Sequence, residues 1–396
     1  MEKITSQFHS KETFLYAIAR TLERASYYGL RAIIVLYMIE GILKMERIEA
    51  LAVYGWFVGA YIIAQILGAI LGDLILGNKK AIILGGIIQS LGAFSLCISS
   101  TTGLYVGLAL VILGGGLYSP NISSNFGKLY LNKTKLLDAG FTVFFLAINI
   151  GAWIGIMSIG TIGENYGWNI GFIIAGIMML FSIIPILLLK DNEVELKMET
   201  TISQKQRIIF ISFALFLVGV FWAIYEISSI RIFNLQLQLR EVSTLNISEG
   251  IWSSFDQMLL IPFSLLAFIL WTYFYNSQFF KLMIGFIFGA ISYGIIFMIP
   301  EIPSDQHTVL YLISISCLSI AEIHISLVVY SILTQYGNPK YLAILISLAS
   351  IPTRLLSYLA ISYSEGLYEN QPLAILIGVI SMCVLSLVLI VYNQKK

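Results

Sequence analysis

The chain has 396 residues, of which 58% are apolar and only 11% are charged. Soluble globular domains carry about 25% charged residues, so this composition indicates a protein embedded in lipid. The formal net charge of +1 excludes a strong overall field of the kind that attracts nucleic acid or an acidic partner. The 3 cysteines lie far apart without CxxC or Cys/His spacing, and this pattern indicates neither a disulfide framework nor a metal site.

Apolar stretches long enough to cross a bilayer, roughly 20 residues, recur along the whole chain. Those of the first half lie near 14–39, 51–77, 81–100, 103–122, 139–163 and 168–189. Those of the second half lie near 208–230, 250–275, 280–299, 308–335, 341–364 and 371–392. We therefore expect an all-α membrane protein with 12 transmembrane helices in two six-helix bundles, the major facilitator architecture. The expected parts are an N-terminal bundle at 1–190, a cytoplasmic linker at 191–206 and a C-terminal bundle at 207–396.

The basic residues of the loops fall mainly on one side of this arrangement. With a cytoplasmic N-terminus, most of them, including Lys79, Lys80 and Lys281, lie inside, and only a few, such as Lys44 and Arg240, lie outside. Cytoplasmic loops of membrane proteins carry such an excess of lysine and arginine. We expect both termini to be cytoplasmic and the protein to lie in the cell membrane, which is the inner membrane in bacteria.

The first expected span carries a stripe of polar and charged side chains. At intervals of three and four residues it contains Arg20, Glu23, Arg24, Tyr27, Tyr28 and Arg31, a spacing that places them on one face of a helix. A charge near the bilayer centre costs about 2.5–3.5 kcal/mol, so this face is expected to border a polar interior. In the alternative interpretation, Arg20 or Arg24 neutralises Glu23 and the cluster only locks helices together.

Residues Glu23–Gly29 of this stripe, ERASYYG, resemble the second half of the signature E-x-x-E-R-F-x-Y-Y-G of the proton-dependent oligopeptide transporter family. Arg20 stands where the signature has its first glutamate, and Ala25 replaces its phenylalanine. The segment that ends the fourth span resembles the family's G-x-G-x-x-K-P-N-I-S-x-x-x-G stretch, with Pro120, Asn121, Ile122, Ser123 and Gly127 in place. Ser119 occupies the position of its lysine.

Four further segments extend this resemblance over most of the chain. The fifth span is similar to the F-Y-x-x-I-N-x-G signature through Phe144, Ile148, Asn149 and Gly151. The loop GDLILGNKK is a degenerate form of the facilitator loop motif that retains Asp73. The sequences FWAIYE and AEIHIS resemble the family's seventh and tenth spans, each of which offers a carboxylate, Glu226 and Glu322. The chain is thereby identified as a short, divergent member of the family within the major facilitator superfamily.

The resemblance implies a secondary transporter that imports di- and tripeptides by proton symport with alternating access. It needs no cofactor, because protons are the coupling ion. The substrate-binding residues that we expect are Arg24, Tyr27, Tyr28, Arg31, Asn149, Trp222 and Glu322. Glu23 and Glu226 are the expected proton-coupling residues, and Asp73 is the expected gating residue of the loop motif. Small peptides and the lipid bilayer are the expected partners, and a monomer is expected.

Several alternatives stay open on the sequence alone. Because Arg20 and Ser119 replace a glutamate and a lysine of the signatures, the protein could be an uncoupled peptide uniporter, a facilitator-type transporter of another small organic solute, or a membrane receptor that does not transport. Glu226 and Glu322 could form structural ion pairs, and Trp222 could be an ordinary packing residue. The stretch from Asp256 to Pro262 predicts an interrupted helix beside a cavity. No P-loop, HExxH or GxSxG motif is present, so we expect no enzymatic activity.

Overall fold

The computed structural model describes residues 2–3, 8–41, 43–189, 202–245, 249–362, 366 and 370–394. Most of the expected linker, residues 191–201, lies outside the described part of the chain. The described residues form two compact units. We call the described residues of Phe8–Glu199 together with Gly337–Leu348 the N-terminal unit, and those of Thr200–Tyr336 and Ala349–Lys396, with Glu2–Lys3, the C-terminal unit.

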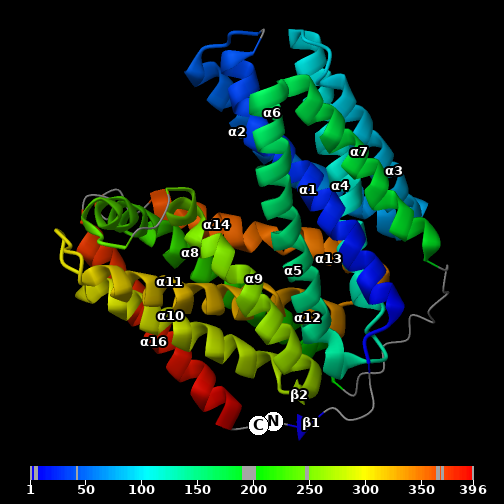
Figure 1. Cartoon of the computed structure of the whole chain (residues 1–396). Coiled ribbons are helices and arrows are strands. Elements are labelled where there is room, and N and C mark those ends of the chain that lie inside the picture. The colour runs from blue at the N-terminus through cyan, green and yellow to red at the C-terminus, as the bar shows by residue number, and fades with distance from the viewer. Residues whose placement is uncertain are drawn as a thin grey trace. The chain divides into compact units, whose positions relative to one another are not determined.

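The N-terminal unit consists of helices in the order expected from the apolar stretches (Figure 1). Its elements are α1 (Lys11–Glu40), α2 (Arg47–Leu71), the π-helix η1 (Gly72–Leu76), α3 (Asn78–Ser95), α4 (Thr101–Lys128), the 3-10 helix η2 (Thr134–Leu136), α5 (Leu137–Gly155), the π-helix η3 (Ile156–Gly160), α6 (Thr161–Tyr166), α7 (Trp168–Leu188), the 3-10 helix η4 (Pro339–Tyr341) and α13 (Leu342–Leu348). Gly77 and Gly167, with φ of 80° and 107°, make the tight turns before α3 and α7, where the missing Cβ permits a positive φ.

Small residues set the distance between α1 and α5, which pack along each other. A Cβ on Gly155 would overlap the carbonyl oxygen of Ala25, and one on Gly151 would overlap that of Thr21. Such contacts let helix backbones approach closely in membranes, where van der Waals packing drives helix association. The polar stripe of α1 is thereby held directly against α5 as well as against α2 and α4.

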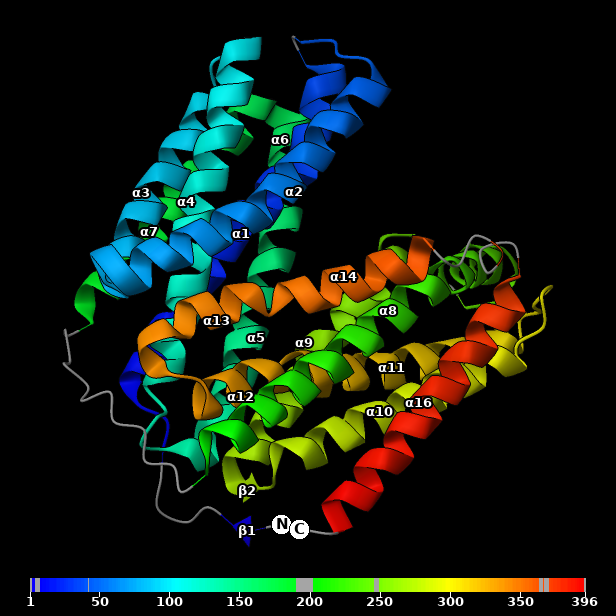
Figure 2. The same cartoon turned by 180° about the vertical axis from the view of Figure 1, so that it is seen from behind.

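The segment 337–348 packs with the N-terminal unit although it follows most of the C-terminal unit in sequence. Its helix α13 lies against α2 and α4 (Figure 2). The span expected at 341–364 is therefore divided, since α13 ends at Leu348 and α14 begins at Ser350 as part of the C-terminal unit.

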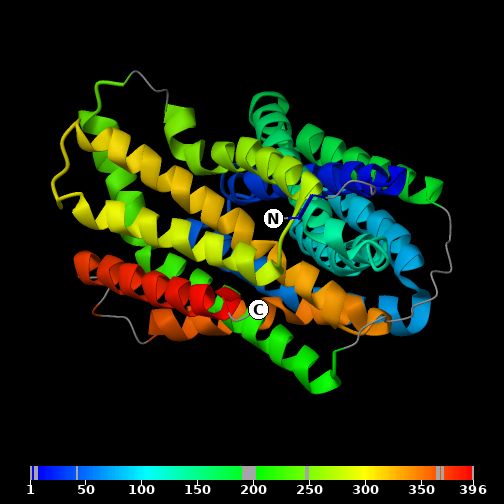
Figure 3. The same cartoon turned by 90° about the horizontal axis from the view of Figure 1, so that it is seen from below.

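The C-terminal unit is also helical. Its elements are α8 (Gln204–Val242), α9 (Glu249–Tyr273), α10 (Gln278–Met298), α11 (His307–Ser326), α12 (Val328–Tyr336), α14 (Ser350–Ser362) and α16 (Gln371–Gln394), with the short antiparallel pair β1 (Glu2–Lys3) and β2 (Phe274–Tyr275). Helix α10 packs between α11 and α16 (Figure 3), and α14 packs along α8. The prediction of an interrupted eighth span is wrong, because α9 continues through Pro262. A proline in a membrane helix is tolerated where neighbouring groups satisfy the freed carbonyl.

Ten helical segments of the described residues are long and apolar enough to cross a membrane. Two of the expected spans are not among them. One corresponds to α1, which contains the charged stripe, and the other to α3, which has 18 residues and begins with Asn78, Lys79 and Lys80. Length and composition therefore establish a helical, multi-pass membrane protein without confirming the count of 12.

Before α1, the chain is attached to the loop that follows α4. The hydroxyl of Tyr130 lies 2.8 Å from His9 Nδ1 and 2.8 Å from Thr13 Oγ1, and Lys133 Nζ donates to the carbonyl oxygen of Phe8 at 3.4 Å. Tyr130 is 2% exposed. Burial, together with the positive charge of Lys133, lowers the pKa of His9 to about 4, so its imidazole is neutral near pH 7.

Candidate functional site

The polar stripe of α1 is buried inside the N-terminal unit. Arg20 and Arg24 are each 6% exposed, and Glu23 is fully buried. Tyr27 is buried as well, whereas Tyr28 and Arg31 are partly exposed. The spacing of three and four residues thus predicts correctly that one face of α1 lies largely in the interior of its unit.

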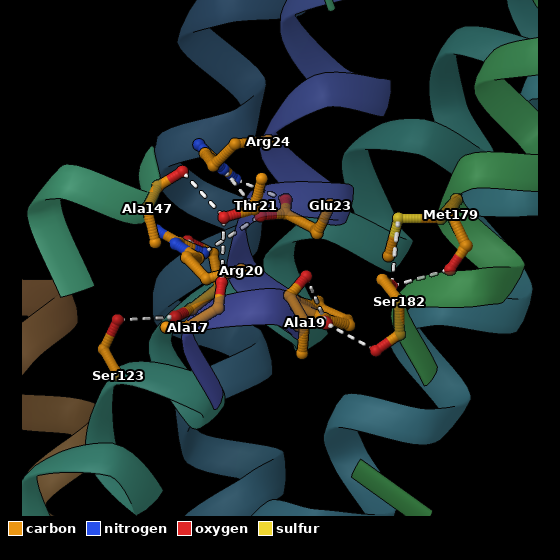
Figure 4. Close-up of polar contacts among 12 residues, drawn as sticks. Ala17, Ala19, Arg20, Thr21, Glu23, Arg24, Ser123, Ala147, Met179 and Ser182 are labelled. Atoms are coloured by element: carbon orange, nitrogen blue, oxygen red, sulfur yellow. Dashed lines mark hydrogen bonds and ion pairs between the residues drawn. The ribbon is translucent and has the colours of Figure 1, made fainter. Parts of the chain in front are cut away.

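Three of these residues form an ion cluster around one carboxylate (Figure 4). Arg24 donates from Nε to Glu23 Oε2 at 2.6 Å and from Nη2 to Glu23 Oε1 at 2.5 Å. Arg20 Nη1 donates to Glu23 Oε2 at 3.1 Å. The two parallel bonds from Arg24 are the bidentate geometry in which guanidinium–carboxylate pairs are strongest. The ion pairs that are expected if the cluster only locks helices together are therefore present.

The cluster is connected to neighbouring helices by uncharged groups. Arg20 Nη1 also donates to Ser119 Oγ of α4 at 3.1 Å, and its guanidinium lies 5.3 Å from the ring centroid of Phe144 on α5. Arg24 Nη2 donates to the hydroxyl of Tyr61 on α2 at 3.1 Å. The Nε of Arg20 is buried and has no hydrogen-bond partner in the described structure.

Arg31 lies two turns further along α1, in an aromatic environment. Its Nε and Nη2 donate to the hydroxyl of Tyr54 at 2.9 and 2.6 Å. The rings of Tyr27, Tyr28 and Tyr54 each lie 5.6 Å from its guanidinium carbon. Among the described residues Arg31 has no carboxylate partner, so its positive charge is balanced only by hydroxyl and ring dipoles.

The predicted site residue of α5 has a local partner. Asn149 donates from Nδ2 to the carbonyl oxygen of Phe145 at 3.0 Å, one turn earlier in the same helix, and is partly exposed. Its side-chain oxygen has no partner in the described structure. Asn149 therefore retains an acceptor group at the surface of α5.

Asp73 of the loop motif lies in a second polar network of the N-terminal unit. Its Oδ1 accepts from Asn78 Nδ2 at 2.9 Å and lies 4.0 Å from Lys128 Nζ. Its Oδ2 accepts from the backbone N–H of Ile344 at 3.0 Å. Ile344 is in the first turn of α13, where N–H groups lack partners within the helix and a negative charge is favourable. Asp73 thus joins η1 to α4 and α13.

The C-terminal unit carries the other predicted site residues. Glu322 on α11 is partly buried, while Glu226 on α8 is exposed. Neither side chain makes a hydrogen bond or ion pair with another described residue. The structural ion pairs considered as an alternative for these two glutamates are therefore not observed within the described part of the chain. The negative charge of Asp256 on α9 acts on Glu322, and both act on Tyr225. Trp222 packs edge to face against Tyr225, with ring centroids 5.3 Å apart.

The sequence patterns do not identify several residues that complete these sites. Tyr54 and Tyr61 on α2 bind Arg31 and Arg24. Their spacing of seven residues places them on one face of the helix, but no charged residue of α2 after Glu49 marks that face as polar. Asn78, which binds Asp73, lies within the loop motif GDLILGNKK, and this position is the clearest signal among them. His324, two residues after Glu322, packs against Trp271 at 5.7 Å between ring centroids.

Comparison with known proteins gives a family match for one part of the chain. The profile of the POT family matches residues 79–190. The di-/tripeptide transporter of Lactococcus lactis subsp. lactis (strain IL1403) is 36% identical over 171 residues, which are 41% of this chain and 34% of the relative. The uncharacterized transporter YclF of Bacillus subtilis (strain 168) is 31% identical over 193 residues, 48% of this chain and 39% of the relative. The matches thus span about a third to two fifths of the length of these relatives.

Solved structures share the fold over nearly the whole chain. The crystal structure of the peptide transporter POT in complex with sulfate superposes with a TM-score of 0.62 at 21% identity, covering 100% of this chain and 96% of that one. A POT family transporter in complex with 5-aminolevulinic acid gives a TM-score of 0.62 at 20% identity, covering 100% and 98%.

The protein is therefore a multi-pass helical membrane protein with the fold of POT transporters. The match at 79–190, together with the relatives, confirms the resemblance to the proton-dependent oligopeptide transporter family that the signatures indicate. The relatives are transporters, which are not enzymes, and this agrees with the absence of enzyme motifs in the sequence.

Proposed function

We propose that the protein imports di- and tripeptides by proton symport with alternating access. The observation that carries this proposal is the polar stripe of α1, where the guanidinium groups of Arg24 and Arg31 lie 4.8 and 5.6 Å from the ring centroid of Tyr27. Charged groups inside a helical membrane protein are costly and mark substrate or ion pathways. The proposal is supported by the names of relatives such as the di-/tripeptide transporter of Lactococcus lactis and by the shared fold.

The finer architecture belongs to the same proposal. We assign 12 spans to two six-helix bundles, 1–190 and 207–396, joined by a cytoplasmic linker at 191–206. Both termini are cytoplasmic, the protein lies in the cell membrane as a monomer, and protons are the coupling ion without any cofactor. The positive-inside distribution of basic residues supports the orientation.

The substrate roles follow from the charges of a peptide, which is a zwitterion. Arg24 and Arg31 receive its carboxylate, because guanidinium groups bind carboxylates with paired N–H donors. Tyr27, Tyr28 and Asn149 orient its backbone. These five residues all come from α1 and α5 of the N-terminal unit.

We assign the binding of the substrate's amino group, and the binding of the coupled proton, to carboxylate side chains. Glu322, which has no cationic partner among the described residues, receives the amino group, and Trp222 provides an aromatic wall. Glu23, which accepts hydrogen bonds from Arg20 and Arg24, and Glu226 are the residues proposed for proton coupling. Asp73 serves in gating through its bond to α13.

The test is uptake of labelled dialanine into liposomes with and without an inward proton gradient. Peptide symport predicts accumulation that requires the gradient and is lost in Arg24→Ala, with protein-free liposomes as the control. Accumulation without a gradient effect would instead identify an uncoupled uniporter. Absence of dialanine uptake would refute peptide import and direct attention to another small organic solute, or to a receptor if peptide binds without entering.

A further inference from the structure

The polar stripe of α1 carries more positive than negative charge. Its charged groups are the guanidinium groups of Arg20, Arg24 and Arg31 and the carboxylate of Glu23, so three positive charges and one negative charge sum to +2. Apart from one another, the groups that act most strongly on these guanidinium groups are Glu23 and tyrosines, and a tyrosine is uncharged near pH 7. Arg20 and Arg24 are each 6% exposed, and an unpaired charge in such a position is strongly unfavourable.

Arg20 has one edge of its guanidinium group without a hydrogen-bond partner. Its Nη1 donates to Glu23 Oε2 and to Ser119 Oγ, each at 3.1 Å. Its Nε is buried without a partner, and its Nη2 makes no hydrogen bond to any described residue. In Arg24 the same two atoms, Nε and Nη2, bind both oxygens of Glu23 (Figure 4). A carboxylate at the corresponding edge of Arg20 would be bound by the same pair of parallel bonds.

This edge lies close to the residue proposed to bind the peptide carboxylate. Arg20 Nη1 and Arg24 Nε donate to the same oxygen, Glu23 Oε2, at 3.1 and 2.6 Å, so the two guanidinium groups are adjacent. A second acidic group near the carboxylate that Arg24 receives would therefore be near Arg20. A peptide that ends in aspartate or glutamate has such a group, because its main-chain and side-chain carboxylates belong to the same residue.

The charges at positions 20 and 119 indicate how many negative charges the substrate brings. In the signatures that this chain resembles, these positions hold a glutamate and a lysine, whose formal charges cancel. Arg20 and Ser119 together leave one positive charge at the contact of α1 with α4. One additional carboxylate on the substrate would balance this charge.

We propose that Arg20 is a specificity-determining residue that binds the side-chain carboxylate of peptides ending in aspartate or glutamate, so that the protein prefers these peptides to neutral ones. The inference rests on the proposed function and adds a second carboxylate contact beside the one given to Arg24 and Arg31. Neutral peptides such as dialanine are weaker substrates, because they supply no acceptor for the Nε–Nη2 edge of Arg20.

Competition against the uptake of labelled dialanine into liposomes tests this preference in the wild type. Alanylglutamate and alanylglutamine have nearly the same shape and differ in the charge at the end of the side chain. We expect alanylglutamate to reach half-maximal inhibition at a concentration at least about tenfold lower, as for one charge-assisted bidentate contact. Glutamylalanine carries its acidic side chain at the amino end and should have no such advantage over glutaminylalanine. An equal advantage for both acidic peptides would overturn the inference.

Three substitutions separate this role from a purely structural one. Arg20→Gln leaves the bidentate partner of Glu23 in place and should abolish the preference for alanylglutamate, whereas Arg20→Lys keeps the charge without the planar fork and should retain part of it. Arg231→Gln is the matched control, since Arg231 on α8 is likewise 6% exposed and donates to the carbonyl oxygens of Ile299 and Pro300. It should lower the amount of folded protein without changing the preference. A full preference in Arg20→Gln, or in Arg20→Lys if the glutamine variant does not fold, would overturn the inference.

A binding measurement distinguishes this inference from the proposed function. A ligand that binds the folded state raises the thermal unfolding midpoint, and we expect a larger rise with alanylglutamate than with alanylglutamine. Dialanine uptake without any difference between these two peptides would overturn the inference and leave peptide import intact. A larger rise with alanylglutamate in a protein that takes up no peptide would refute import and support the role of Arg20. Neither stabilisation nor uptake with any of the peptides would overturn both.

Discussion

Replacement of Gly155 by alanine tests how the site is held in place. The added methyl group would overlap the carbonyl oxygen of Ala25 and lie 2.8 Å from its carbonyl carbon and Cα. These atoms belong to the backbone of α1, so no side-chain rotation relieves the overlap and the two helices must separate. Overpacking of this kind costs about 1–3 kcal/mol. We expect Gly155→Ala to lower the thermal unfolding midpoint and to reduce dialanine uptake.

Gly160→Ala is the control for this change. Position 160 lies one helical turn beyond Gly155, in η3, and a Cβ there has its nearest neighbour, Ala32 Cβ, at 3.9 Å. Both substitutions gain the same helix propensity, about 1 kcal/mol, so their difference reports the contact with α1. Thermal unfolding in detergent and uptake in liposomes measure both variants. Equal midpoints for the two proteins would refute the close α1–α5 contact as the constraint on the stripe.

The other predictions concern single charged groups. Arg24→Ala removes the bidentate partner of Glu23 and should lower dialanine uptake at least about tenfold, as expected for the loss of a charge-assisted bond. Glu322→Gln should raise the concentration of dialanine needed for half-maximal uptake, since it removes the charge proposed to bind the amino group. Asp73→Asn keeps an acceptor for Ile344 but loses the charge near Lys128 and should slow uptake with little change in dialanine binding. Because the pKa of His9 is lowered to about 4 in the folded protein, the unfolded chain binds a proton at this residue at higher pH than the folded protein does. The free energy of unfolding should therefore decline as pH falls from about 6.5 to about 4 and be constant at higher pH. In His9→Asn, unfolding midpoints measured over the same pH range should show a smaller decline.

Substitutions of the same residue types elsewhere in the chain serve as controls for these variants. Arg47→Ala and Glu301→Gln change exposed residues and should leave uptake unaltered. His307→Asn alters a partly exposed histidine and should preserve the loss of stability between about pH 6.5 and pH 4. Wild-type uptake in Arg24→Ala, or an unchanged pH series in His9→Asn, would count against the corresponding role.

The sequence predicts best those features that depend on the free-energy cost of placing the residues of a single helix in lipid. The cost of a charge in lipid makes the stripe at Arg20, Glu23 and Arg24 recognisable, and its burial is confirmed. The lengths of the apolar stretches locate the spans. However, α1 and α3 are not among the helices that are apolar enough to cross a membrane, because α1 contains charged residues and α3 begins with polar ones. Single-helix patterns therefore predict which face is polar better than they predict how many helices cross the membrane.

Contacts between helices cannot be predicted from patterns within one helix. Tyr61 binds Arg24, and Ser119 binds Arg20, through distances that depend on how α2 and α4 pack against α1. The proximity of Asp256 to Glu322 likewise depends on the packing of α9 with α11. The proline at 262 predicts a break because its ring removes one backbone bond, yet the packing of the unit keeps α9 continuous.

Because residues 337–348 pack with α2 and α4, the N-terminal unit is assembled from two separate stretches of polypeptide. A gene cut within 191–206 would yield an N-terminal fragment without the Ile344 amide that Asp73 accepts from. Such a fragment should be unstable when produced alone and should recover when the second fragment is produced with it. Complementation would then require the stretch 337–348 even where the rest of the second fragment is dispensable for folding.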